Sequence, residues 1–145
     1  MPDAAHNLGD DKIWDTIRAE TQSAATQEPI LASFLHATVL KHETLEDAMS
    51  FHLAGKLADV NVTAMLIREV IDEAFASDLM IPAALRCDIQ AVRDRDPASE
   101  YYYVPMLFFK GFHALQSYRV AHWLWGQNRR AMALHLQSRI SEVFA

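Results

Sequence analysis

The segment CDIQAVRDRDPASEYYYVPMLFFKGFHALQSYRVAHWLW, from Cys87 to Trp125, decides how this chain folds. It holds the longest helical pattern and the one aromatic run of the sequence. After Pro105 no further proline occurs up to Trp125, so one uninterrupted helix is predicted there. A helix that is apolar around most of its circumference is usually surrounded by partners. We therefore expect a central helix in a helical domain or a helical oligomer.

Small residues occupy the middle of one stripe on this predicted helix. The stripe, at steps of three and four, consists of Leu107, Gly111, Ala114, Tyr118, Ala121 and Trp125. The absence of bulk at Gly111 and Ala114 predicts that another helix approaches closely. Because so much apolar surface exceeds what a small monomer exposes, we also expect self-association.

A second helix precedes this segment and ends in a run of charges. Its apolar stripe leads into Arg93, Asp94, Arg95, Asp96 and Pro97. The residue before a proline is disfavoured in the α region, so the helix should end near Asp94 or Arg95. Asp96 then lies on extended backbone. By itself this pattern favours an exposed, charged helix terminus that is closed by proline.

The composition is that of a globular protein of one domain. The 145 residues are 51% hydrophobic and 22% charged, with a formal net charge of −6. This charge argues against nucleic-acid or anionic-membrane partners, which require concentrated basic residues. The start, MPDAAHNLGDD, lacks the features of a signal peptide, and no apolar run is long enough to span a membrane. We expect a cytoplasmic protein whose single cysteine, Cys87, is a buried thiol.

The rest of the chain is predicted to be helical as well. Residues 1–11 are expected to be a disordered tail, and residues 12–145 a single domain. Helical periodicity recurs in several segments, Thr44 and Thr63 are suitable N-cap residues, and Gly126 to Asn128 fits a helix end. No sustained alternation indicates a sheet, and the run Tyr101 to Val104 is too short to form one. The fold class is therefore all-α, a compact domain of about seven helices that is suited to oligomerisation.

Few residue patterns point to a catalytic or metal site. His42 and Asp47 match the spacing of one acyltransferase motif, but they straddle a predicted helix start. The histidines lack the spacing of a metal site and are expected at helix surfaces or core edges: His36, His52, His113, His122 and His135. The tyrosines from Tyr101 to Tyr103 either cover the central helix or contact another subunit. The pair Arg129 and Arg130 is expected to interact with a helix dipole.

Four segments together carry a family resemblance. The RDPA segment, Arg95–Ala98, and KGFHALQSYRVAHWLW resemble the N-terminal helical domain of bacterial serine O-acetyltransferases. The segments EPILASFLHATVLKHETLEDAMSFHLAGKL and IREVIDEAFASD are similar to the same family. The resemblance covers nearly the whole chain from Ile13 onward.

The resemblance implies an activity and a set of partners. Members of the family transfer acetyl from acetyl-CoA to L-serine and so make O-acetyl-L-serine for L-cysteine biosynthesis. Their helical domains assemble trimers into a dimer of trimers. Their left-handed β-helix of hexapeptide repeats carries the catalytic histidines and the acetyl-CoA site, and their C-terminal tail docks O-acetylserine sulfhydrylase. This chain stops where those repeats should begin, so it is expected to hold no catalytic residue, cofactor or metal and to be inactive alone.

The resemblance assigns one substrate contact to this chain. The aspartate of the RDPA segment, here Asp96, reaches the serine site, with Pro97 beside it. A carboxylate suits the ammonium group of an amino acid. Two hypotheses remain: the chain is the oligomerisation and substrate-contact domain of the enzyme, or it is a non-catalytic helical scaffold or regulator derived from that domain.

Overall fold

A computed structural model describes residues 11–96 and 100–145 of the chain. Within these ranges every regular element is a helix, which confirms the all-α class. The α-helices there number eight, against the predicted seven or so: α2 (Lys12–Gln27), α3 (Ala32–Leu35), α4 (Leu45–Leu57), α5 (Ala64–Ser77), α6 (Met80–Arg95), α7 (Tyr103–Phe108), α8 (Lys110–Gly126) and α9 (Arg130–Phe144). A 3₁₀ turn, η1 (Pro29–Leu31), and a π-helical turn, η2 (His36–Leu40), flank α3. No helix in the described part of the chain is long and apolar enough to cross a membrane.

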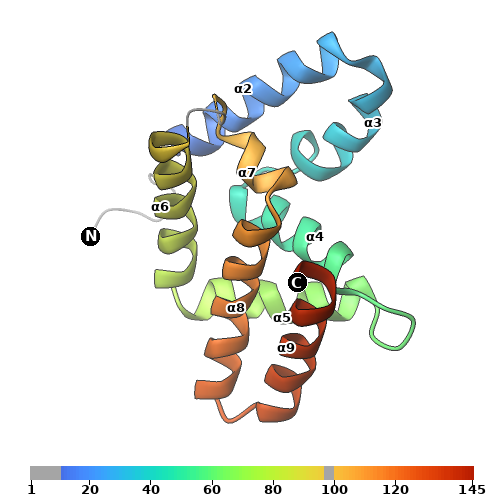
Figure 1. Cartoon of the computed structure of the whole chain (residues 1–145), viewed down its shortest axis with the longest axis vertical. Helices are drawn as coiled ribbons and strands as arrows, with labels where there is room; N and C mark the ends of the chain where they lie inside the picture. The colour runs from blue at the N-terminus through green and yellow to red at the C-terminus, as the bar shows by residue number, and fades with distance from the viewer. Residues whose placement is uncertain (1–10, 97–99) are drawn as a thin grey trace.

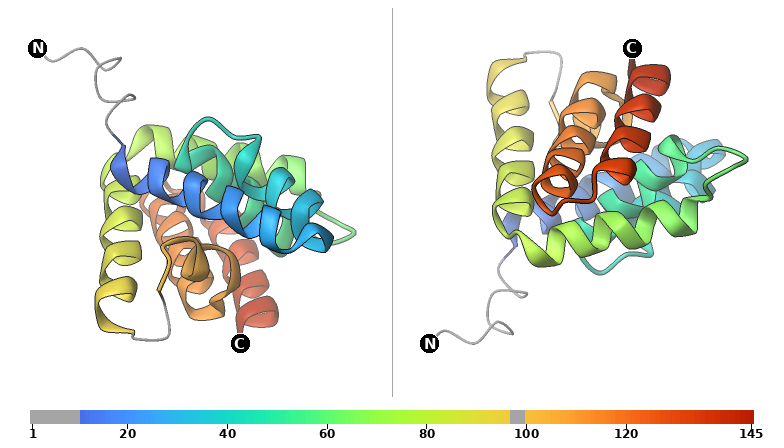
Figure 2. Two further views of the ribbon diagram at one scale, coloured as in Figure 1. Left: turned by 90° about the horizontal axis from the view of Figure 1, so that it is seen from above. Right: turned by 90° about the horizontal axis from the view of Figure 1, so that it is seen from below.

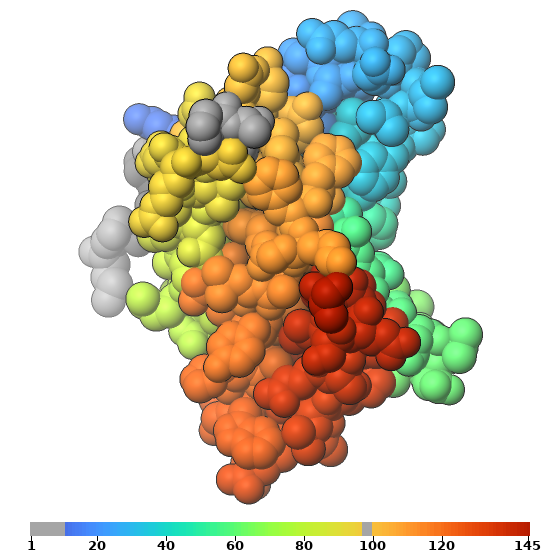
Figure 3. Space-filling view, in the orientation of Figure 1, coloured from blue at the N-terminus to red at the C-terminus, as the bar shows by residue number. Residues whose placement is uncertain are grey.

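α8 packs against α5, α6, α7 and α9, in line with the central position expected for this segment. α8 and α9 form an antiparallel pair, while α4 and α5 form a second close pair (Figure 1). α6 runs beside α8, and α5 meets the lower end of α6 and crosses behind α8 (Figure 1). Figure 2 shows α2 laid across one end of this arrangement. In the space-filling view, α8 and α9 form the lower front of the molecule, and α2 with α3 the upper right (Figure 3).

Local sequence signals account for several helix ends. The Thr44 hydroxyl accepts the Asp47 N–H at 3.1 Å and caps α4, whereas the Thr63 side chain makes no cap bond to α5. α6 ends at Arg95, within the predicted range, because the residue preceding Pro97 is driven out of the helical region. Asn128, at φ 60°, closes the turn between α8 and α9.

The first described residue, Asp11, belongs to the folded structure although the sequence assigned it to the tail. One of its oxygens accepts the Trp14 N–H at 3.2 Å and caps α2. The other pairs with Arg86 of α6 at 2.5 Å. Arg86 pairs with Glu46 of α4 at the same distance, so this guanidinium joins the starts of α2 and α4 to the middle of α6.

The central helix is not continuous, and this corrects the prediction made from its sequence. α7 ends at Phe108, Phe109 adopts an extended conformation at φ −95° and ψ 109°, and α8 begins at Lys110. No proline or glycine occupies position 109, so the local sequence contains no signal for the break.

The buried face of α8 also differs from the predicted stripe. Gly111, Tyr118 and Trp125 are exposed, and the space around a Cβ placed on Gly111 is open. The core instead receives a neighbouring face: Phe112, His113, Gln116, Ser117, Val120, Ala121 and Leu124. Helix α6 holds a further correction, because Cys87 is exposed rather than buried.

Candidate functional site

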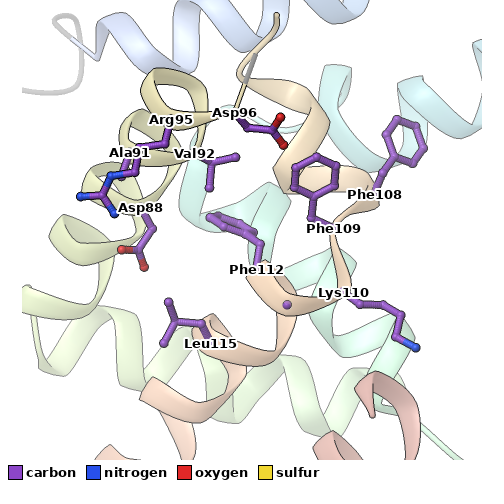
Figure 4. A pocket seen from close by; sticks show the side chains of 11 residues that line it. Asp88, Ala91, Val92, Arg95, Asp96, Phe108, Phe109, Lys110, Phe112 and Leu115 are labelled. Atoms are coloured by element: carbon purple, nitrogen blue, oxygen red, sulfur yellow. The ribbon is translucent and has the colours of Figure 1, made fainter. Parts of the chain in front are cut away.

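A cavity of about 880 Å³ lies between the end of α6 and the junction of α7 with α8. Figure 4 shows the side chains that surround it. Its lining combines apolar and charged residues: Asp88, Ala91, Val92, Arg95, Asp96, Phe108, Phe109, Lys110, Gly111, Phe112 and Leu115. It is larger than two other cavities in the described part of the chain, of about 230 and 380 Å³, and it contains the residue that the resemblance singled out.

Asp96 sits at the rim of this cavity. It is the first residue after α6, on extended backbone at φ −106° and ψ 106°, as predicted. Its N–H donates to the Val92 carbonyl at 2.9 Å, which ties its backbone to the last turn of α6. Figure 4 shows its carboxylate directed toward the phenyl rings across the cavity. Pro97, the other predicted contact with serine, lies outside the described residues.

Aromatic rings form the opposite wall. Phe108 ends α7, Phe109 occupies the break, and Phe112 begins the buried face of α8 (Figure 4). On the α6 side, Ala91 and Val92 complete the apolar lining. An apolar wall lowers the local dielectric, so charged contacts made at the rim are stronger than in open water.

A second carboxylate at the cavity, that of Asp88, is bound by two side chains of α8. One oxygen of Asp88 accepts hydrogen bonds from Gln116 at 2.7 Å and from Arg119 at 2.9 Å. Both donors come from α8, whereas Asp88 is in α6, so the contact joins the two cavity walls. Residues 28 and 31 positions apart have no local sequence signal, and this cluster was not predicted. Asp88 thus joins α6 to α8.

The tyrosines after the predicted serine loop pack against α6 and α2. The Tyr102 hydroxyl donates to the Gln90 side chain at 2.9 Å, and the Arg93 guanidinium lies 4.3 Å from the centre of the Tyr102 ring. The Tyr101 and Tyr103 rings are stacked, 5.7 Å apart. Tyr102 and Tyr103 are half-buried, so the aromatic run covers helices within this chain, and Tyr101 remains largely exposed.

Two histidines are buried together, contrary to the surface or core-edge positions expected for them. The His52 and His113 rings, from α4 and α8, lie 5.1 Å apart and are 7% and 1% exposed. Burial lowers the pKa of His52 to about 4, and the neighbouring His113 adds to that effect. Burial also lowers the pKa of His113. The sequence contained one signal for the burial of His113: it shares a helical face with Ser117, Val120 and Leu124, all of which are buried.

The remaining candidate residues serve local structure. His42 is buried; its Nε2 lies 3.0 Å from the Ala37 carbonyl and its ring contacts Phe51, so it supports the turn before α4. Arg129 pairs with Glu73 of α5 at 2.7 Å, and Arg130 lies over the Trp125 ring. The expected interaction of this pair with a helix dipole stays a prediction. Within residues 11–96 and 100–145, no three potential ligand side chains are grouped so as to hold a metal ion.

Comparison with known proteins agrees with this architecture. A family model described as serine acetyltransferase, N-terminal, matches residues 13–117. The serine acetyltransferase of Escherichia coli (strain K12) is 54% identical over 132 residues, which are 91% of this chain and 48% of that protein. The chain thus spans about half the length of this curated relative.

Solved structures show the same fold. A serine acetyltransferase in complex with CoA superposes with a TM-score of 0.89 at 52% identity, covering 91% of this chain and 56% of the other. Another, from Neisseria gonorrhoeae and in complex with serine, has a TM-score of 0.89 at 44% identity, covering 94% of this chain and 57% of the other. The family match, the identity to relatives and the shared helical fold together place this chain in the serine acetyltransferase family, in the region of its N-terminal domain.

Proposed function

We propose that this chain is the oligomerisation and substrate-contact domain of a serine O-acetyltransferase. The enzyme would transfer acetyl from acetyl-CoA to L-serine and release O-acetyl-L-serine for L-cysteine biosynthesis. The observation that carries the proposal is the placement of Asp96 at the rim of the cavity, on extended backbone just past the end of α6. Membership of the family supplies the reaction.

Asp96 would bind the ammonium group of serine. A carboxylate that forms a charge-assisted hydrogen bond with an ammonium group favours an amino acid over a neutral alcohol. The phenyl wall opposite would strengthen this contact by excluding water.

The chemical step would depend on residues outside this chain. The serine hydroxyl must lose its proton to a base, attack the thioester carbonyl and displace the thiolate of CoA. His52 and His113 do not fit the role of base, because both are buried and both ring systems contact backbone carbonyls. The base and the acetyl-CoA site would belong to a hexapeptide-repeat domain, and this chain alone would be inactive.

Assembly would use the apolar surface at the start of α6 and along α8. Its exposed residues are Leu79, Met80, Leu115, Tyr118 and Trp125. Met80, Leu115 and Tyr118 also line a smaller cavity of about 230 Å³. Contiguous exposed apolar surface of this kind marks protein interfaces. We infer that the protein self-associates through this surface. The enzyme would be cytoplasmic and would have no nucleic-acid or membrane partner. Its further partner, O-acetylserine sulfhydrylase, would bind elsewhere.

A chimeric enzyme tests the proposal. This chain would be joined to the part of the Escherichia coli relative that follows the matched region, and acetyl transfer to serine would be measured. Asp96→Asn keeps the shape but removes the charge, and loss of such a bond should raise the KM for serine about tenfold to a hundredfold. The KM for acetyl-CoA should not change.

Asp94→Asn is the matched control. Asp94 is exposed, in the last turn of α6, and accepts the Gln90 amide at 2.9 Å. It does not line the cavity, so its variant should keep the wild-type KM for serine. An inactive chimera would count against the enzyme hypothesis and favour a scaffold or regulator. Full activity of Asp96→Asn at limiting serine would refute the serine contact and leave Asp96 as a charge at a helix end.

A further inference from the structure

The break between α7 and α8 leaves backbone groups that need partners. At the end of a helix the last carbonyl groups have no N–H from the following turn. α7 ends at Phe108, and the Phe109 N–H reaches back only to the Pro105 carbonyl, at 3.3 Å. The carbonyls of Met106 and Leu107 lie in the buried interior, where an unpaired polar group is costly.

Two imidazoles bind these carbonyls. Nε2 of His113, in α8, lies 2.7 Å from the Met106 oxygen. Nε2 of His52, in α4, lies 3.2 Å from the Leu107 oxygen. A carbonyl oxygen can only accept, so each Nε2 must carry a proton and donate. Two side chains, one of them 55 residues away, therefore satisfy the end of α7.

The break between α7 and α8 also determines where the aromatic side chains of the cavity wall lie. Phe108, Phe109 and Lys110 are the last residue of α7, the extended residue and the first residue of α8, and all three line the cavity beside Asp96. If α7 continued into α8 as one helix, successive side chains would project about 100° apart, as 3.6 residues per turn require. The Phe109 ring, which lies beside the Asp96 carboxylate in Figure 4, could then not keep its present position.

We propose that His52 and His113 are positioning residues that cap α7 through its carbonyls, hold the break at Phe109, and so place the phenyl wall that faces Asp96. The structural part of this proposal concerns the break alone. Its functional part, an effect on serine, rests on the proposed function of the domain.

The proposal requires one tautomer. A neutral imidazole has a single N–H, and here it must be on Nε2 for both residues. The buried Nδ1 of His113 has no hydrogen-bond partner among the described residues, as expected for the unprotonated nitrogen. Their surroundings are largely aromatic: Phe34 lies against His52, and Phe112 and Phe144 lie against His113. The charged group whose field reaches both rings is Lys56 of α4, which opposes protonation.

Nuclear magnetic resonance of this chain tests the structural part. Imidazole ¹⁵N shifts at neutral pH should show the Nε2–H tautomer for both residues. His52→Leu and His113→Leu keep apolar volume but remove the donor, whereas the corresponding Gln variants keep an N–H near the Nε2 position. The ¹³Cα shift of Phe109 should move from extended toward helical values in the Leu variants and stay extended in the Gln variants.

His122→Leu is the control, because His122 is exposed on the same helix. It should leave the Phe109 shift unchanged. An Nδ1–H tautomer at either buried histidine would overturn the proposal even if a Leu variant failed to fold. Folded Leu variants with an unchanged Phe109 shift would overturn it as well.

The functional part is measured in the chimeric enzyme. The Leu variants should raise the KM for serine about two- to tenfold, the size of one neutral hydrogen bond, and the Gln variants should restore it. The KM for acetyl-CoA should stay constant. If Asp96→Asn raises the KM for serine and the Leu variants do not, the positioning inference fails; if Asp96→Asn itself has no effect, the proposed serine contact fails.

Discussion

Glu20 in α2 accepts a hydrogen bond from the backbone N–H of Tyr102, at 3.3 Å, across 82 residues of sequence. This bond ties the segment that follows Asp96 to a helix from the other end of the chain. Burial raises the pKa of Glu20, while the backbone N–H groups of Tyr102 and Tyr103 and the charge of Arg93 act to lower it. The half-buried carboxylate of Glu20 therefore holds the segment at Tyr102 against α2.

Replacing Glu20 by alanine should loosen this segment. The Tyr102 N–H would lose its acceptor, so its amide should exchange faster with solvent, and the free energy of unfolding should fall by about 1 kcal/mol. Glu20→Gln keeps an acceptor oxygen and should have a smaller effect. Hydrogen exchange followed by NMR gives the first quantity, and urea unfolding gives the second.

Glu28→Ala is the control for this change. Glu28 is exposed at the C-terminal end of α2, so its variant should leave the Tyr102 amide unaffected. Equal protection of the Tyr102 amide in the wild type and in Glu20→Ala would show that the loop is held by other contacts.

The buried histidines predict a loss of stability in mild acid. The pKa of His52 is lowered from 6.5 to about 4 in the folded chain, and that of His113 is lowered too. The unfolded chain therefore binds more protons between these values, so stability falls as pH drops from 6.5 toward 4. For His52 the loss amounts to about 3 kcal/mol at most. Glu20, whose pKa is raised, contributes in the opposite direction at the acid end of this range.

Urea unfolding at several pH values between 7 and 4.5 measures the effect. His52→Gln cannot titrate, so its stability should depend less on pH than that of the wild type. His122→Gln, on the exposed face of α8, should keep the wild-type dependence. Identical pH profiles for His52→Gln and the wild type would rule out the buried pair as the source.

Leucine at Gly111 should be tolerated by the fold. The space around its Cβ is open, so no overpacking arises, and removal of a helical glycine can add up to about 1 kcal/mol of stability. Ala121→Leu is the contrast, because Ala121 is 0% exposed and overpacking there should cost about 1–3 kcal/mol. Thermal unfolding compares the two. A lower Tm for Gly111→Leu would mean that this surface is covered, for instance by another copy of the chain.

Charge introduced on the apolar surface of α6 and α8 should weaken self-association. Met80 is 73% exposed and Leu115 is 41% exposed, so the double change Met80→Lys with Leu115→Lys should leave the fold intact while shifting the sedimentation coefficient toward the monomer. Val60→Lys, at a position 97% exposed in the loop before α5, is the control. A wild-type chain that sediments as a monomer across micromolar concentrations would contradict assembly through this surface.

Local chemistry determined much of this protein before any tertiary contact is considered. Helical periodicity established the all-α class, and the proline after Asp96 predicted the end of α6 and the extended conformation of Asp96. The cap at Thr44 and the turn near Asn128 followed in the same way. Each of these features depends on residues within a few positions of one another, so the sequence was sufficient to predict them.

Tertiary structure alone decided the features that depend on distant residues. The break at Phe109 has no local signal, and the buried Leu107 carbonyl beside it contacts His52, which lies 55 residues away in the sequence. The pairing of Asp88 with Gln116, and the choice of which face of α8 is buried, likewise depend on how the helices pack. A helix that is apolar on most sides can bury any of those sides, so the periodicity of α8 did not predict which face is buried. The packing of α5, α6 and α9 against α8 determines that face.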